Sequence, residues 1–375
     1  MKYPAVFARG GTSKALIFHA ADLPSDRARW DAIFLSAIGS PDPYGRQLNG
    51  IGGGVSSLSK VCVVGPSSRP DADIDYTFAQ VQIKEARVDY SGNCGNMSSA
   101  MGPFAVDEGL VKTDDGQAVV RIHNTNTRKV ISATFAVAAG QSVVVGDLVI
   151  PGVSGSGAPV RLDFLDPGGA STGKLLPTGR AIDRLDVPGV GSIEVSMVDA
   201  ANACAFIHAA TLGLTGTELP DALDARPDLL QKLDAIRRAA SVAMGIAKSP
   251  EEARAKRMIP YITMLCAPCE TQTLSGETIS AESVDLVVRM LSNGQPHRAL
   301  PLTGSLCTAV ASYIEGSLPN RFVRSNRSGS LRLAMPSGVL TVDATVERQP
   351  GGAWHVAHGS FFRTTRRLFE GFVHA

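Results

Sequence analysis

The pattern of apolar and polar residues predicts short strands arranged around two similar helices. Apolar and polar positions alternate over residues 81–90, which is typical of a half-buried strand. Small and apolar residues then continue to Glu108, where Gly109 signals the end of a helix. A second small-residue helix follows the glycine-bearing turn at 299–304. Since each helix follows a polar turn and is flanked by strand patterns, we predict an α+β protein with two pseudo-repeated domains.

Shorter patterns predict the scaffold around these helices. The other predicted elements are a hairpin of strands 4–7 and 15–18, a helix over 25–38, strands over 61–64, 141–151 and 160–164, a helix over 229–244, and strands over 260–265, 331–334, 339–347 and 354–362. Glycine and serine dominate residues 152–159, which indicates a linker. We therefore expect an N-terminal domain over residues 1–152 and a C-terminal domain over residues 153–375.

Length and composition narrow the classes of protein that fit. A chain of 375 residues is longer than one hydrophobic core ordinarily accommodates, which favours two domains. The formal net charge is +1 and no long basic run occurs, so we expect no nucleic-acid partner. The N-terminus lacks the apolar core of a signal peptide and no run of about 18 apolar residues occurs, so we expect a cytoplasmic protein with no membrane partner. Six scattered cysteines do not resemble a secreted disulfide framework.

The turn before the first of these helices carries a cysteine among glycines and asparagines, in the order Asn93, Cys94, Gly95 and Asn96. This places Cys94 at a helix N-terminus, where unpaired backbone N–H groups and the helix dipole stabilise a thiolate and can hold a carboxylate. The alternative is a buried cysteine that acts as a small hydrophobic residue. The glycines and asparagines around the thiol favour a chemical role.

Two further glycine-bearing loops are candidates for ligand binding. The first places Arg9 and Ser13 beside a glycine pair, and its many hydrogen-bond donors suit an anion; a solvated hairpin turn is the alternative. The second, residues 49–60, contains four glycines and ends in Ser59 and Lys60. Ordering such a loop loses much backbone entropy, which favours a ligand, and a buried Lys60 amine would suit a general base. From this loop alone, a surface lysine at a strand start is the better interpretation.

Two other features contain residue types that occur in catalytic or metal sites. His123 lies among strand residues, where a hydrogen-bonded structural role is the alternative to acid–base chemistry. Cys266 and Cys269 form a CxxC pair, but structural zinc needs four ligands and no second pair lies nearby. We therefore expect no metal site.

Several motifs occur together in one order along the whole chain. They are Arg9-Gly10-Gly11-Thr12-Ser13-Lys14, Asp22-Leu23-Pro24, the glycine-rich stretch ending in Ser59-Lys60, Asn93-Cys94-Gly95-Asn96, residues 212–219, and Pro301-Leu302-Thr303-Gly304. This combination resembles the PrpF-like family of methylaconitate isomerases and 4-oxalomesaconate tautomerases, which has the diaminopimelate epimerase fold. The resemblance implies two epimerase-like domains, each a barrel-like sheet around a central helix, with the active site between them.

The resemblance also implies cofactor-independent proton transfer on short unsaturated di- and tricarboxylates. It assigns the acid and base roles to Lys60 and Cys94. The substrate would lose a proton at an allylic carbon, pass through a dienolate and regain a proton elsewhere, which moves the C=C bond. A small anionic polycarboxylate is then the expected partner, and no cofactor is expected.

The residues themselves agree with such a reaction. A carbon acid needs a base tuned near neutrality, an acid, and donors directed at the enolate oxygen. The expected substrate-binding residues are Arg9, Ser13, Ser59, Asn93, Gly95, Asn96, Thr303, Gly304 and Ser305. The alternatives are keto–enol tautomerisation of 4-oxalomesaconate and non-catalytic carboxylate binding by an accessory protein, and the sequence leaves a homodimer open.

Two positions depart from the expected pattern. Relatives often carry a Pro-Lys pair near the strand that follows the long helical region, whereas this chain reads Arg257-Met258-Ile259-Pro260-Tyr261, which leaves the carboxylate contact of that lysine open. Ser305 stands where a diaminopimelate epimerase places its second catalytic cysteine, and Cys307 lies about half a helical turn further along. This disfavours two-thiol racemisation of an amino acid.

Overall fold

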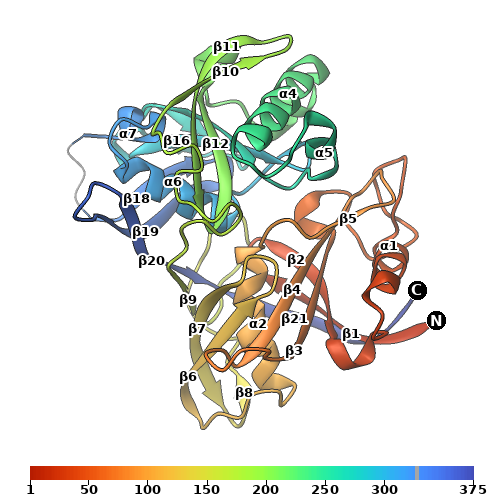
Figure 1. Cartoon of the computed structure of the whole chain (residues 1–375). Coiled ribbons are helices and arrows are strands. Elements are labelled where there is room, and N and C mark those ends of the chain that lie inside the picture. The colour runs from red at the N-terminus through yellow and green to blue at the C-terminus, as the bar shows by residue number, and fades with distance from the viewer. Residues whose placement is uncertain (326–328) are drawn as a thin grey trace. The chain divides into compact units, whose positions relative to one another are not determined.

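A computed structural model describes residues 1–325 and 329–375 and divides the chain into two compact units. The first unit contains residues 1–165 and 361–375, and the second contains residues 166–360 (Figure 1). Both ends of the chain therefore belong to the first unit, where the backbone N–H of the last residue donates to the carbonyl of the first at 2.9 Å.

This division differs from the predicted boundary after residue 152. Strand β9 (Val160–Leu165) pairs antiparallel with β7 (Lys129–Ala138), which keeps it in the first unit. The final strand β21 (Thr365–His374) pairs antiparallel with β1 (Lys2–Gly10), so the chain returns to its first unit at its end. Pairing between strands far apart in sequence leaves no local signal, and a boundary read from a glycine-rich segment cannot show it.

The first unit holds a sheet with alternating antiparallel and parallel pairings. Its other elements are β2 (Ser13–His19), α1 (Trp30–Ile38), β3 (Lys60–Pro66), β4 (Ile74–Val81), β5 (Val88–Asp89), α2 (Gly95–Asp107), β6 (Gly116–Asn124) and β8 (Gln141–Ser142). Strand β1 pairs antiparallel with β2, β2 parallel with β3, β3 antiparallel with β4, β4 parallel with β6, and β6 antiparallel with β7. The predicted N-terminal hairpin is confirmed.

The second unit repeats this order of pairings. Its elements are β10 (Asp183–Val187), β11 (Gly191–Ala200), β12 (Asn202–His208), α3 (Pro220–Asp224), α4 (Pro227–Ala243), α5 (Pro250–Ala255), β13 (Tyr261–Cys266), β14 (Thr271–Gln272), β15 (Thr278–Ile279), β16 (Leu286–Ser292), β17 (Gln295–Pro296), α6 (Leu302–Tyr313), α7 (Leu318–Phe322), β18 (Leu331–Met335), β19 (Gly338–Arg348) and β20 (Trp354–Arg363), whose last three residues enter the first unit. Strand β11 pairs antiparallel with β12, β12 parallel with β13, β13 antiparallel with β16, β16 parallel with β18, and β18 antiparallel with β19. The predicted pseudo-repeat is confirmed.

Each unit packs its strands around one buried helix. Helix α2 contacts β1, β2, β3, β6, β7, β8, β9 and β21, and all of its residues except the last are buried. Helix α6 contacts β11, β12 and β19 and is likewise buried except for its last residue. Small residues permit this packing, because a Cβ at Gly102 of α2 would lie 2.8 Å from the Phe135 ring and 3.0 Å from the Ala133 side chain.

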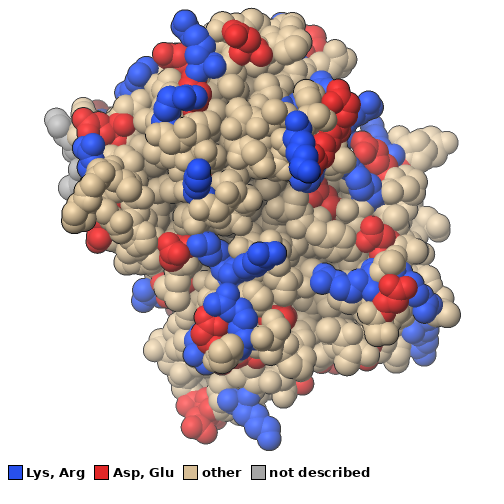
Figure 2. All heavy atoms as spheres, in the orientation of Figure 1, with Lys and Arg blue, Asp and Glu red and all other residues tan. Residues whose placement is uncertain are grey.

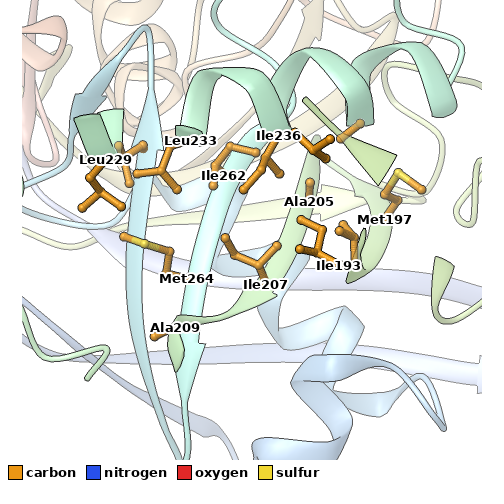
Figure 3. Packing of buried hydrophobic residues seen from close by; sticks show 14 of the residues in the cluster. Ile193, Met197, Ala205, Ile207, Ala209, Leu229, Leu233, Ile236, Ile262 and Met264 are labelled. Carbon is orange, nitrogen blue, oxygen red and sulfur yellow. The ribbon is translucent and has the colours of Figure 1, made fainter. Parts of the chain in front are cut away.

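Helix α4 covers one face of the strands in the second unit. Leu229, Leu233 and Ile236 lie on the side of α4 that faces Ile207 and Ile262 of the sheet (Figure 3). All five belong to one cluster of buried hydrophobic residues. Burial of an apolar stripe is the main stabilisation of an amphipathic helix, and the helix predicted over 229–244 is confirmed.

Two predicted strands are wrong. Residues 81–90 form no continuous strand, because the Gln82 N–H donates to the Arg87 carbonyl at 3.0 Å and reverses the chain between β4 and β5. Of residues 141–151, only the first two form a strand, and an isolated β-bridge holds the loop that follows. In both places alternation continues through a turn, which a pattern of period two does not separate from a strand.

Candidate active site

Lys60 and Cys94 lie side by side in the first unit. Lys60 is the first residue of β3, and Cys94 immediately precedes α2. The Lys60 amine donates to the Cys94 sulfur, with Nζ and Sγ 3.4 Å apart, and each residue is only 6% exposed. Parallel pairing of β2 with β3 aligns Ala15 with Lys60 and so fixes where the lysine stands in the sheet. The two residues that the sequence selected from separate loops therefore meet.

The pair has few polar neighbours. The Ser13 hydroxyl lies 4.0 Å from the Cys94 sulfur, and the Lys60 ammonium lies 5.0 Å from the centre of the Phe78 ring. Among the described residues no carboxylate forms an ion pair with Lys60. Within the described residues, the recorded partners of this amine are therefore the Cys94 sulfur and the Phe78 ring, and an anionic ligand would supply a carboxylate partner that the protein does not.

A second cysteine on β3 is kept neutral. Cys62 is fully buried and its sulfur lies 3.8 Å from the Tyr76 hydroxyl. Burial raises the pKa of Cys62, and the neighbouring Cys94 raises it further; burial likewise raises the pKa of Tyr76. Both groups stay protonated near neutral pH, so they are poor proton acceptors. Of the two thiols on this side of β3, Cys94 is the one with a cationic partner.

The glycine pair of the N-terminal hairpin allows the turn to close on α2. A Cβ at Gly10 would lie 2.6 Å from the backbone oxygen of Asn96, and a Cβ at Gly11 would lie 2.2 Å from the Asn96 side-chain oxygen. Gly11 also has a φ of +51°, which favours glycine. The Asn96 side chain donates to the Thr12 hydroxyl at 3.1 Å. These contacts place Ser13 beside Cys94.

The start of α2 offers backbone donors to a ligand. The first N–H groups of a helix have no acceptor within the helix, and the Cys94 side chain forms no capping hydrogen bond. No acidic residue occupies the first turn. Gly95 and Asn96 supply two of these N–H groups next to the thiol. The Asn93 side chain is fixed behind the turn, where its oxygen accepts from Asn124 at 3.0 Å.

Arg9 and Ser59 have structural contacts where the sequence predicts substrate contacts. Arg9 Nη1 donates to the carbonyls of Gly11 at 3.0 Å and Thr364 at 2.8 Å, which ties the hairpin to the C-terminal segment. The fully buried Ser59 hydroxyl lies 2.7 Å from the side-chain oxygen of Gln47. Both side chains thus already use donors that the prediction assigns to the substrate.

The glycine-rich loop is ordered by one glutamine. Gln47 is 1% exposed, donates from Nε2 to the Ser40 hydroxyl at 2.9 Å and accepts from the Gly54 N–H at 2.9 Å. A Cβ at Gly52 would lie 2.3 Å from the Gln47 side-chain oxygen. The sequence suggested that a ligand orders this loop. In the structure, hydrogen bonds with the Gln47 side chain order it from within the protein.

Thr303, Gly304 and Ser305 belong to the second unit and lie in the first turn of α6. The Thr303 hydroxyl accepts from Asn202 Nδ2 at 3.0 Å, and the Ser305 hydroxyl donates to the Pro301 carbonyl at 3.0 Å. All three residues are buried. Their recorded contacts are internal to this unit, whereas the Lys60–Cys94 pair is complete in the first unit.

The pseudo-repeat places Tyr261 in the second unit where the first unit has Lys60. Tyr261 begins β13 just as Lys60 begins β3, and both strands pair in parallel with the strand that ends the preceding hairpin. Asn202 Nδ2 donates to the Tyr261 hydroxyl at 2.8 Å as well as to Thr303. A buried hydrogen-bonded cluster of neutral side chains thus occupies the position in the second unit that is equivalent to Lys60 and its surroundings in the first.

Sequence reasoning missed Arg363. The predicted strand over 354–362 stops one residue before it, and the chain segment that carries it joins the first unit. Arg363 is 5% exposed, and its Nε donates to the side-chain oxygen of Asn96 at 3.2 Å. The three arginines in residues 363–367 could have indicated an anion-binding segment. Nothing in the sequence, however, places Arg363 beside α2.

The remaining candidates stand apart from the pair. His123 Nδ1 lies 2.8 Å from a carboxylate oxygen of Asp75, which is a structural contact between strands. The sulfurs of Cys266 and Cys269 are 3.8 Å apart in the second unit. Across the described residues, no group of three His, Cys, Asp or Glu side chains is placed to hold a metal ion.

Charged side chains of both signs lie on the surface of the protein (Figure 2). Figure 2 shows basic and acidic side chains interspersed on one face of the molecule, with wide neutral areas between them. In the part of the chain that the structure describes, no helix is both long and apolar enough to cross a membrane.

Comparison with known proteins places the whole chain in one group. The model of the PrpF protein family matches residues 1–375. The chain is 42% identical to the 3-methylitaconate isomerase of Eubacterium barkeri, over 100% of this chain and 97% of that protein. It is 38% identical to the 2-methyl-aconitate isomerase of Cupriavidus necator, with 100% and 97% covered. It is 35% identical to the (4E)-oxalomesaconate Delta-isomerase of Novosphingobium sp. (strain KA1), with 99% and 96% covered.

Solved structures are also similar to this chain over nearly its whole length. The crystal structure of a methylitaconate-delta-isomerase aligns with a TM-score of 0.78 at 42% identity, over 100% of this chain and 95% of that chain. A hydroxyproline epimerase from Agrobacterium vitis aligns with a TM-score of 0.57 at 12% identity, over 99% and 92%, and shows the fold alone. The predicted epimerase-like α+β fold is confirmed. Because the family model and the relatives named above span the whole chain, this protein belongs to the PrpF family and is an isomerase.

Proposed function

We propose that this isomerase shifts a C=C bond in a short unsaturated di- or tricarboxylate by proton transfer through Lys60 and Cys94. The observation that carries the proposal is the 3.4 Å contact between the two side chains in a buried site. The names of the relatives support the substrate class, since they refer to 3-methylitaconate, 2-methylaconitate and oxalomesaconate.

The pair holds one acid and one base in either of its proton arrangements. An ammonium beside a thiolate and an amine beside a thiol carry the same number of protons, so one partner can accept a proton while the other donates one. An allylic shift removes a proton from one carbon and returns a proton to the carbon two bonds away. Two neighbouring groups suit this reaction because the two reacting carbons are themselves close together.

The start of α2 supplies the stabilisation that the intermediate needs. Removal of the allylic proton gives a dienolate, whose negative charge is spread onto the oxygens of the conjugated carboxylate. The N–H groups of Gly95 and Asn96 and the positive end of the helix dipole favour that charge. Ser13, 4.0 Å from the sulfur, lies close enough to contact a group bound over the thiol.

The substrate class is tested by incubating the enzyme with 3-methylitaconate, 2-methylaconitate and 4-oxalomesaconate in deuterated water. We expect deuterium to enter the carbons of the allyl system of at least one compound, as seen by NMR, together with the shifted isomer. Binding of all three compounds without exchange would instead support a non-catalytic carboxylate-binding protein.

Keto–enol tautomerisation of 4-oxalomesaconate is the second candidate, because a relative at 35% identity is named for oxalomesaconate as its substrate, although that name refers to a C=C shift. Proton exchange next to the keto group then needs a single acid–base group, and Cys94 would suffice. Substitution of Lys60 distinguishes the two reactions: an allylic shift needs both side chains, whereas this tautomerisation retains its rate when only Lys60 is replaced.

A further inference from the structure

Arg363 is a buried cation beside the proposed active site. Its Nε donates to Asn96 at 3.2 Å and its Nη1 donates to the Phe362 carbonyl at 2.9 Å. The Phe361 ring lies 5.7 Å from the centre of the guanidinium. Within the described residues, Nη2 takes part in no hydrogen bond. One edge of the guanidinium is therefore fixed by the protein while the other remains able to donate.

The positive charge of Arg363 is not balanced by the protein. Burial lowers the pKa of Arg363 to about 10, so the side chain is still protonated at neutral pH. No carboxylate of the described residues pairs with it. The buried Arg289 shows another solution, because all three of its guanidinium nitrogens donate to carbonyl or hydroxyl oxygens, whereas Nη2 of Arg363 has no such partner within the described residues. Keeping a buried, unpaired cation is unfavourable unless a ligand supplies the opposite charge.

Three features place this cation where an anionic ligand would bind. Asn96 is the second residue of α2, which starts next to Cys94. The side chain of Asn96 contacts both Thr12 and Arg363, so it links the hairpin turn to the guanidinium. A Cβ at Gly11 would lie 3.1 Å from Arg363 Cδ, which shows how closely the arginine packs on the turn. The helix N-terminus, with no acidic residue in its first turn, adds to the positive potential.

We propose that Arg363 binds the carboxylate of the substrate that is not conjugated with the reacting double bond, and that Asn96 positions the guanidinium for this contact. This inference rests on the proposed function. A guanidinium can offer two parallel N–H groups to a carboxylate, which sets distance and orientation. Arg363 would thus select di- and tricarboxylates over monocarboxylates, while the backbone donors at the start of α2 bind the conjugated carboxylate.

The test compares the wild type with Arg363→Gln and Arg363→Lys, using the polycarboxylate that the wild type isomerises and its monomethyl ester at the remote carboxylate. We expect R363Q to raise KM for the acid about 10- to 100-fold, the loss typical of a charged hydrogen bond, and to change kcat much less. R363K should lie between, because it keeps the charge without the planar fork. For the ester, which lacks the charge, the wild type and R363Q should have equal kcat/KM.

Exposed Arg184 in the second unit provides a control, and R184Q should behave like the wild type. An unchanged KM in R363Q, or an equal loss for acid and ester, would overturn the inference. Circular dichroism verifies folding, and R363K carries the comparison if R363Q does not fold. If the wild type isomerises none of the compounds, the proposed function fails; calorimetric binding of the acid by the wild type and R363K then tests Arg363 on its own.

Discussion

The Lys60 amine and the Cys94 sulfur are 3.4 Å apart, and both residues come from the same unit. A substrate bound over this pair therefore meets both groups from one side. Under the proposed mechanism, removal and return of the proton then occur on one face of the allyl system. This geometry differs from a two-base arrangement in which the acid and the base stand on opposite faces of a carbon.

We accordingly predict suprafacial proton transfer. The isomerase is supplied with a substrate whose two reacting carbons can each be made stereogenic by deuterium, and NMR establishes the configuration of both. Loss and gain on the same face are expected because Lys60 and Cys94 stand together. Delivery of the new proton to the opposite face would mean that one of the two residues does not carry a proton in the reaction.

The contact between Gly11 and Asn96 predicts a specific sensitivity to a methyl group. Gly11→Ala places a Cβ 2.2 Å from the Asn96 side-chain oxygen. Gly109→Ala is a matched control, since Gly109 also has a positive φ, +70°, but has no atom within 4 Å of such a Cβ. We expect G11A to lose about 1–3 kcal/mol more stability than G109A in urea unfolding, together with most of its activity. Equal losses in the two variants would show that the backbone conformation alone matters.

Gln47→Ala tests how the glycine-rich loop is ordered. The substitution leaves the half-buried Gly54 N–H and the Ser40 and Ser59 hydroxyls without their glutamine partner. We expect a loss of about 1–3 kcal/mol in stability and faster amide hydrogen exchange over residues 49–59. Gln141→Ala on the surface is the control. Unchanged exchange in Q47A would indicate that other contacts hold the loop.

A pH-dependent part of the stability is assigned to Asp285. Burial works to raise the pKa of this carboxyl, but hydrogen bonds from Arg332 outweigh burial and leave the pKa below its usual value. A lowered pKa in the folded state gives stability that is present above the unfolded pKa of about 3.9 and is lost as pH falls through the folded value. Asp285→Asn should unfold more easily at pH 7 and lose less stability than the wild type as pH falls below about 4. Parallel curves of unfolding free energy against pH would contradict this assignment.

Much of the fold could be predicted from local patterns, and so could Lys60 and Cys94 as candidate site residues. The N-terminal hairpin, α2, α6 and α4 each have a clear periodicity, and their small residues or apolar stripes set how they pack. Lys60 and Cys94 were recognisable because each ends a glycine-bearing turn next to a regular element. The family resemblance then assigned the two residues to one active site.

Other features depend on contacts between distant parts of the chain. β21 pairs with β1 across more than 350 positions, Arg9 contacts Thr364 over a similar separation, and Arg363 contacts Asn96 across 267 positions. No local pattern encodes such contacts. The glycines at 10 and 11 suggested a ligand loop, whereas the structure uses them for close approach to Asn96. Glycine is compatible with either use, so sequence could not separate them.

The most direct test of the central claim is solvent exchange by Lys60→Met and Cys94→Ser in deuterated water, followed by NMR on a substrate that the wild type isomerises. Loss of either member of the acid–base pair should lower isomerisation about 100- to 10,000-fold, while two controls, exposed Lys112→Met and half-buried Cys269→Ser in the second unit, keep full activity. Binding of the substrate should persist in both active-site variants. Full isomerisation and deuterium exchange by folded K60M would contradict the account.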